Sequence, residues 1–221
     1  MSQKTNWKTV FLRSLLIFLL AQPQILAQLG GRSADEWISQ LGREGRVSRL
    51  KIDEVVSYLN LKPGNNVADL GAGSGVFSGP LARSVAPEGK LFSVEIDQGL
   101  LNHIKERTEQ EGLTNVHTVL GKFDDPNLPT NEIDVAFFHD VLHHIEKRQN
   151  YLKALALYLR RESRIVVIDL IKGHPKAPHR NQPQMQISLE ELEGWMKKIG
   201  FSLTSKYDLF ENKFFVVFSR M

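Results

Sequence analysis

Short apolar segments alternate with helical ones through most of this chain, and no other feature constrains the fold as strongly. Runs rich in Val, Ile, Leu and Phe predict strands at residues 67–70, 90–96, 116–120, 133–138 and 164–170. The spacing of apolar residues between them predicts helices at 76–85, 98–111, 141–159 and 188–199. Such an alternation favours a mainly parallel sheet with helices on both faces.

The end of the chain departs from this alternation. Residues 202–210 and 213–220 predict two strands with only Glu211 and Asn212 between them. So short a connection joins antiparallel neighbours, because parallel strands need a long crossover. The expected fold is therefore an α/β domain built on a seven-stranded, mainly parallel sheet with the last strand antiparallel.

A glycine-rich turn, VADLGAGSGVFS at residues 67–78, follows the first predicted strand. In open sheets of this kind ligands bind beyond the carboxyl ends of the strands, and glycine lets the backbone approach them closely. The turn fits neither familiar phosphate-binding pattern. A dinucleotide fingerprint needs glycine where Val76 stands, and a P-loop would end in Gly-Lys followed by Ser or Thr.

The pattern D-L-G-A-G-S-G instead resembles the first motif of the class I S-adenosylmethionine-dependent methyltransferases, and the resemblance covers roughly residues 45–221. It implies a Rossmann-like fold with S-adenosylmethionine as the cofactor. The residues that it implies for cofactor binding here are Asp69, Gly71, Ala72, Gly73, Ser74, Gly75, Glu95 and Ile96. Asp69 would lie near the charged amino-acid end of the cofactor. Glu95 ends the second predicted strand, where a carboxylate can accept hydrogen bonds from both ribose hydroxyls.

The segment after the third predicted strand, LGKFDDPNLP, matches the family less well. Lys122 stands where the family usually has an acidic residue that contacts the adenine amino group. Asp124 is the expected substitute, with Asp125 as the alternative, and Phe123 is expected to flank the adenine ring. Either aspartate also suits a turn before Pro126.

Histidines and an aspartate gather after the fourth predicted strand, in FFHDVLHHIEKRQN at residues 137–150. The segment resembles that of small-molecule methyltransferases of the quinone-biosynthesis type, which implies that His139 contacts the cofactor. His143 and His144, with Asp140, are the candidate catalytic residues, since an imidazole titrates near neutral pH and can act as a base. Each histidine could instead cap or pack within the predicted helix.

A divalent metal is a second reading of this cluster. With Asp169 at the end of the fifth predicted strand, a catechol-type site is conceivable. The rest of that family's pattern is not matched, so no metal is predicted.

The polar loop at residues 171–188 follows the fifth predicted strand. Long loops at the ligand-binding edge of a sheet often act as lids or specificity elements. His179 and Arg180 are the candidate substrate contacts in this loop, and a solvated connector is the alternative.

Charge and composition limit the choice of partner. Of 28 basic residues, three lie in the first 28 positions, which hold no acid, so the remaining chain balances 25 basic against 25 acidic residues. A neutral body without a basic, aromatic stripe disfavours nucleic acid, and a small-molecule acceptor is expected. Because the chain has no cysteine, disulfides and thiolate metal sites are excluded.

The first 28 residues have the layout of a secretory signal, with a basic start, the apolar run SLLIFLLA and Ala27 before a cleavage point. An uncleaved membrane anchor is the alternative, and export or anchoring is the expected localisation in both cases. Residues 29–62 are expected to form a helical cap, and residues 63–221 the cofactor-binding domain.

These patterns predict an enzyme that transfers a methyl group from S-adenosylmethionine to a small organic acceptor by in-line displacement. Two alternatives stay open at this point. One is a protein that binds S-adenosylmethionine without turnover, and the other is a nucleotide-binding oxidoreductase on a related sheet.

Overall fold

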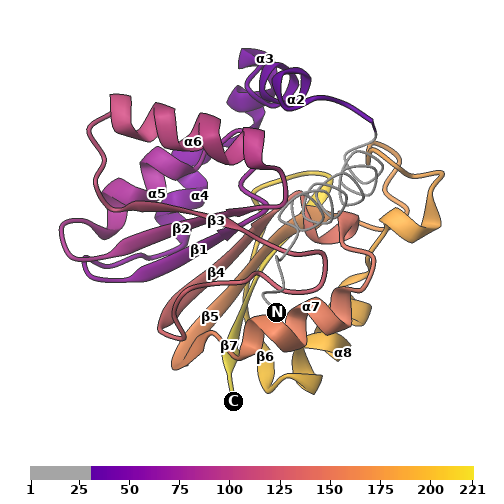
Figure 1. Cartoon of the computed structure of the whole chain (residues 1–221). Helices are drawn as coiled ribbons and strands as arrows, with labels where there is room; N and C mark the ends of the chain where they lie inside the picture. The colour runs from indigo at the N-terminus through magenta and orange to yellow at the C-terminus, as the bar shows by residue number, and fades with distance from the viewer. Residues whose placement is uncertain (1–30) are drawn as a thin grey trace, which may run out of the picture.

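The computed structural model describes residues 31–221, which form one twisted sheet with helices on both faces (Figure 1). The strands are β1 Asn66–Leu70, β2 Lys90–Glu95, β3 Val116–Leu120, β4 Ile133–His139, β5 Leu159–Leu170, β6 Phe201–Tyr207 and β7 Lys213–Arg220. The α-helices are α2 Ala34–Leu41, α3 Glu44–Val47, α4 Ile52–Tyr58, α5 Ser78–Val85, α6 Gln98–Gln110, α7 Arg148–Ala156 and α8 Leu189–Lys198. Three 3-10 turns complete the set: η1 Ser48–Leu50, η2 Leu142–His144 and η3 Pro183–Met185.

The sheet has the order β3-β2-β1-β4-β5-β7-β6. The first five strands pair in parallel, and β7 runs antiparallel between β5 and β6. The predicted seven-stranded sheet with an antiparallel last strand is therefore confirmed. Strand order reverses between β1 and β4, and in such sheets this switch point is where the ligand crevice forms.

Two hydrophobic layers hold the helices to the sheet, because successive residues of a strand point to opposite faces. On one face Val67, Leu91 and Phe137 pack with residues of α4 and α5. On the other face Ala68 and Phe138 pack with residues of α7 and α8. Figure 1 shows the two groups of helices on either side of the sheet.

The predicted helix 141–159 is wrong in its first part. The backbone N–H of His143 donates to the Asp169 carboxylate, and the Arg148 side chain binds the carbonyl oxygens of Leu142 and His143. These side chains pair with the backbone N–H and C=O groups that a helix would have paired with each other, so a 3-10 turn forms and α7 begins only at Arg148.

Two other boundaries also differ from the prediction. β5 starts at Leu159 rather than at 164, because Leu159 pairs with Ile133 before a shift of register. The β6–β7 connection spans residues 208–212 and is not a two-residue turn. The residues before β1 form several short helices: Gly42 ends α2, and Lys51, which has a left-handed backbone with φ 51°, precedes α4.

The expected export segment, residues 1–28, lies outside the described residues. Within residues 31–221 there is no helix with the length and apolar character needed to cross a membrane.

Candidate functional site

A pocket lies at the carboxyl ends of β1, β2, β3 and β4, beside the switch point of the sheet. Most of the residues selected from the sequence line it: Asp69, Gly71, Ala72, Gly73, Ser74, Glu95, Ile96, Phe123, His139, Asp140 and His144. Four successive segments of the chain therefore meet there, because parallel strands bring their carboxyl ends to one edge.

The glycine turn has the backbone that its sequence requires. Gly71 has φ 72°, and a Cβ atom at this position would overlap the side chain of Val141. Only glycine allows the chain after β1 to pass this close to the segment after β4. Gly75 also has a positive φ, but it does not line the pocket: a Cβ there would lie 2.8 Å from Cγ1 of Ile104, so Gly75 serves the packing of α6.

Glu95 holds the turn from the neighbouring strand. Its Oε1 accepts from the Gly73 N–H at 2.9 Å, and its Oε2 accepts from the Ile96 N–H at 2.8 Å. Burial raises the pKa of Glu95, and these two backbone donors oppose the rise. The carboxylate is thus fixed at the edge of the pocket with its remaining lone pairs available to a ligand.

Polar atoms without a partner mark the pocket wall. Among residues 31–221, Asp69 Oδ2, Ser74 Oγ and His139 Nε2 are buried and lack a hydrogen-bond partner within the protein. Burial, and then the nearby Glu95 carboxylate, raise the pKa of Asp69 to about 7. Buried polar groups are normally paired, so these three atoms are suited to meet polar groups of a ligand.

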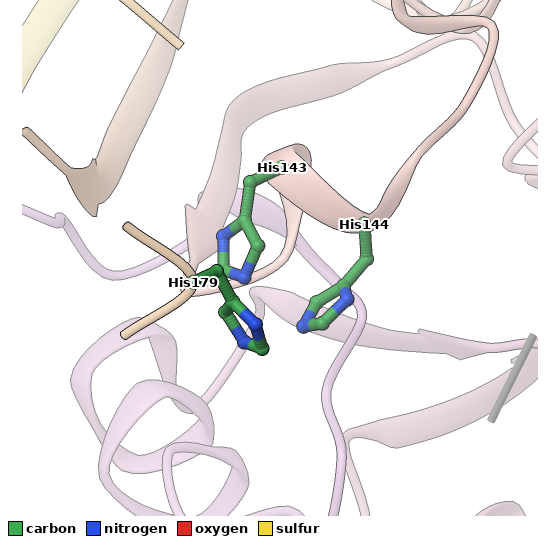
Figure 2. A group of neighbouring side chains, drawn as sticks. All are labelled: His143, His144 and His179. Carbon is green, nitrogen blue, oxygen red and sulfur yellow. The ribbon is translucent and has the colours of Figure 1, made fainter. Parts of the chain in front are cut away.

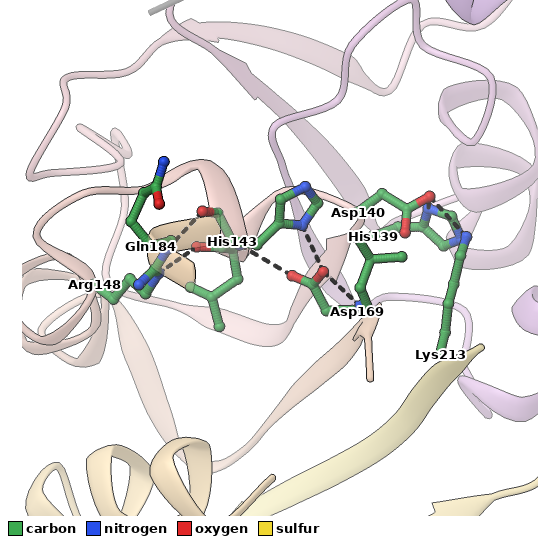
Figure 3. Close-up of polar contacts among 9 residues, drawn as sticks. His139, Asp140, His143, Arg148, Asp169, Gln184 and Lys213 are labelled. Atoms are coloured by element: carbon green, nitrogen blue, oxygen red, sulfur yellow. Dashed lines mark hydrogen bonds and ion pairs between the residues drawn. The ribbon is translucent and has the colours of Figure 1, made fainter. Parts of the chain in front are cut away.

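Figure 3 shows two clusters of polar side chains, and the first joins Asp140 with His139 and Lys213. Asp140 has a left-handed backbone with φ 55°, and its Oδ2 accepts from Lys213 Nζ at 2.7 Å. Burial opposes its negative charge, but His139 and the Lys213 ammonium hold the pKa of Asp140 below its ordinary value. Burial lowers the pKa of His139 to about 4, so its imidazole is neutral near pH 7.

Asp169 organises the second group in Figure 3. His143 Nδ1 donates to Asp169 Oδ1 at 2.6 Å, and both side chains are buried. The structure thus places Asp169 behind His143 as a hydrogen-bond acceptor. His144 lies at the rim of the pocket and is exposed. Partial desolvation lowers the pKa of His144 to about 4, and the neighbouring His143 and His179 contribute to this shift.

Besides Gly75, four predicted site residues do not line the pocket: Asp124, His143, His179 and Arg180. Asp124 is exposed and does not line it, whereas Lys122 and Phe123 do. Asp125 accepts from the Tyr158 hydroxyl at 2.9 Å and from the Asn127 N–H at 2.7 Å, which agrees with the turn reading. Arg180 is exposed, and its guanidinium donates to the carbonyl oxygen of Pro175 within its own loop.

The N-terminal cap supplies lining residues that sequence reasoning missed. Trp37 and Leu41 of α2 line the pocket with Arg46 of α3, although no residue of α2 is fully buried. The apolar spacing of α2 reads as an ordinary core-facing stripe in the sequence. Its role as a pocket cover follows only from its position beside the glycine turn, where a Cβ at Gly73 would lie 3.0 Å from Leu41 Cδ1.

Comparison with known proteins agrees with this geometry. Residues 61–206 match the model of a family described as "Methyltransferase domain". The chain belongs to this family. A ubiquinone/menaquinone biosynthesis C-methyltransferase from Vibrio campbellii is 25% identical over 129 residues, which cover 58% of this chain and 50% of that protein. The chain thus spans about half the length of that relative.

Solved structures share the fold. A SAM-dependent methyltransferase from Aquifex aeolicus superposes with a TM-score of 0.75 at 21% identity, covering 86% of this chain and all of that one. Magnesium protoporphyrin IX methyltransferase from Synechocystis, solved with bound SAM, gives a TM-score of 0.60 at 19% identity, covering 79% and 80% of the two chains. The family assignment places this chain among the methyltransferase-domain proteins, and the oxidoreductase alternative is not favoured.

The pocket fits the cofactor that the family uses. Asp69 Oδ2 and Ser74 Oγ lack a partner within the protein and can accept hydrogen bonds from the ammonium group or a hydroxyl group of S-adenosylmethionine. The fixed carboxylate of Glu95 can accept from the two ribose hydroxyls of the cofactor. We infer that these residues and Gly71 and Gly73 hold S-adenosylmethionine. Arg46 is the basic pocket residue from the cap that can meet its carboxylate.

Cofactor binding is expected to depend on pH through Asp69. With a pKa of about 7 in the free protein, Asp69 is mostly protonated at pH 6 and mostly charged at pH 8. Because the charged form attracts an ammonium group, the association constant for S-adenosylhomocysteine should rise about tenfold between these pH values. Calorimetric titration at pH 6, 7 and 8 measures this. Asp69→Asn should bind weakly with little pH dependence, and a wild-type affinity that does not change would contradict the assignment.

Proposed function

We propose that this protein methylates a small organic acceptor that enters the pocket beside His144. The observation that carries the proposal is that one pocket joins the glycine turn with His139, at the end of β4, and His144, in the segment after it. S-adenosylmethionine supplies an electrophilic methyl group, so the protein mainly has to hold the acceptor in line and manage its proton.

The pocket is suited to a small acceptor. α2 covers it with Trp37 and Leu41, and apolar residues such as Val141 and Ile145 line the part near His144. The rest of the chain after residue 28 is neutral, which provides no broad basic face for a nucleic acid. The Vibrio relative acts in quinone biosynthesis by its printed name, which supports a hydroxylated ring as the first class of acceptor to test.

The histidine cluster is placed to handle the proton that such an acceptor releases. With Nδ1–H donated to Asp169, His143 keeps the lone pair of Nε2 free. His144 lies at the pocket surface next to it, with 4.1 Å between the ring centroids. Asp140 is paired with Lys213, so we propose that it positions the segment after β4.

Turnover with defined acceptors tests this function. The full-length protein is incubated with S-adenosylmethionine and separate panels of phenols, hydroquinones, enols, amines and thiols, and S-adenosylhomocysteine is measured. We expect release that depends on acceptor and is strongest in the hydroxylated panels. Tight cofactor binding with no release from any panel would favour a binding protein without turnover.

A further inference from the structure

Three of the seven histidines of this chain converge at the rim of the pocket (Figure 2). His143 and His144 come from η2, whereas His179 comes from the loop after β5, and one ring nitrogen of each lies within 4.8 Å of the other two. Figure 2 shows the three rings turned toward one another. The sequence does not predict this grouping, since it assigns His179 to the substrate and predicts no metal.

Two of the three rings have their outer nitrogen held by an oxygen acceptor. His143 Nδ1 donates to the Asp169 carboxylate at 2.6 Å, and His179 Nδ1 lies 3.0 Å from the amide oxygen of Gln182. A proton fixed on Nδ1 leaves the lone pair on Nε2, which is the nitrogen left to face the cluster. Protein ligands of transition metals are oriented by the same kind of outer hydrogen bond.

The backbone that carries the rings is also fixed. Arg148 donates to the carbonyl oxygens of His143 and Gln184, and so joins η2 to η3. Gln186 Nε2 donates to the carbonyl oxygens of His179 and Arg180, which fixes the backbone of the loop around His179. The Arg148 contacts bring together two segments that are distant in the sequence.

We propose that His143, His144 and His179 bind one divalent transition metal ion of the zinc type. Three imidazole ligands suit zinc, copper, nickel or ferrous iron rather than magnesium or calcium, which prefer oxygen. Metal–nitrogen bonds of about 2.0–2.1 Å in a tetrahedral site place the nitrogens roughly 3.4 Å apart, so the rings would move inward by about 1 Å on binding. The exposed ring of His144 has the freedom to make this movement.

Three protein ligands leave one coordination position open, as in catalytic zinc sites. In a role that rests on the proposed function, this position takes a phenolic or enolic oxygen of the acceptor. A metal ion lowers the pKa of a bound hydroxyl group, so the acceptor binds as its anion and its proton passes to solvent. Asp169 places a negative charge behind the site and balances the nearby Arg148.

Metal titration of the untagged full-length protein tests the site without any need for turnover. After treatment with a chelator and dialysis, zinc chloride is titrated by calorimetry, and cobalt(II) is added in parallel to read the coordination geometry from its visible spectrum. We expect one zinc ion per chain and a four-coordinate cobalt spectrum. His144→Ala and His179→Ala should each weaken zinc binding more than about 100-fold, and Asp169→Asn should weaken it about 10- to 100-fold.

His174→Ala is the matched control, because His174 lies in the same loop but outside the cluster. It should bind zinc as the wild type does, and circular dichroism should show that all four variants are folded. The site is overturned if the wild type binds no zinc, or if zinc binding survives both His144→Ala and His179→Ala.

A parallel titration with S-adenosylhomocysteine separates this proposal from the proposed function. One zinc ion per chain without cofactor binding would support the metal site and remove the methyltransferase role. Cofactor binding and turnover without zinc binding would overturn the metal site alone.

Discussion

Replacing Glu95 with alanine is expected to weaken the binding of S-adenosylhomocysteine by about 100-fold or more. Hydrogen bonds to a charged group contribute about 1.5–3 kcal/mol each, and a diol would lose two of them. The substitution also leaves the Gly73 N–H without its acceptor, so the glycine turn loses the contact that fixes it against β2. Isothermal titration calorimetry of the wild type and the variant measures the loss.

Two variants control this experiment. Glu95→Gln keeps an oxygen acceptor for Gly73 but has no charge, and should fall between the wild type and Glu95→Ala. Glu88→Ala removes an exposed carboxylate outside the pocket and should bind as the wild type does. Unchanged affinity in Glu95→Ala, or preferential binding of NAD by the wild type, would contradict the cofactor assignment at this residue.

Asp169→Ala is expected to cause the largest loss of stability among single changes at the site. The Asp169 carboxylate accepts from His143 Nδ1, from the His143 N–H and from the Leu170 N–H, all of them buried. Removing a buried acceptor of this kind leaves its donors unpaired, which should lower the free energy of unfolding by about 3 kcal/mol or more. For a domain of this size the melting temperature should fall by about 6–12 °C.

Thermal unfolding followed by circular dichroism measures this fall. Asp208→Ala is the matched control, because Asp208 is exposed in the loop after β6 and should change the melting temperature by less than about 1 °C. A fall of less than about 2 °C in Asp169→Ala would show that the Asp169–His143 pair does not organise η2.

The elements that sequence reasoning placed correctly are those with a local signal. The alternation of apolar strands and helices, the Gly71–Gly75 turn and the acid at the end of β2 are each encoded within a few neighbouring residues. Their expected position at one sheet edge followed from the rule that parallel strands end together. The prediction of a helix over 141–159 failed because the backbone of η2 is bound by Asp169, from a distant strand, and by the Arg148 side chain, which turns back onto it.

The parts of the site that were missed depend on contacts between distant segments. The Lys213–Asp140 ion pair joins β7 to the end of β4 at 2.7 Å, and no pattern near either residue indicates it. α2 carries an apolar stripe that the sequence cannot distinguish from a core-facing one. Phe210 lies outside β6 and packs near His139, with ring centroids 6.3 Å apart, because the strand ends at Tyr207.

The sequence by itself determined the sheet, its family and the turn that receives the cofactor, because hydrophobic periodicity and glycine geometry act over short stretches of chain. Only the tertiary structure decided which histidines meet. His143 and His144 lie next to each other in the sequence, but His179 reaches them through a loop whose path is set by Arg148, Gln182 and Gln186. Side-chain contacts across such distances depend on the folded positions of both segments, and the local sequence of one segment does not determine the position of the other.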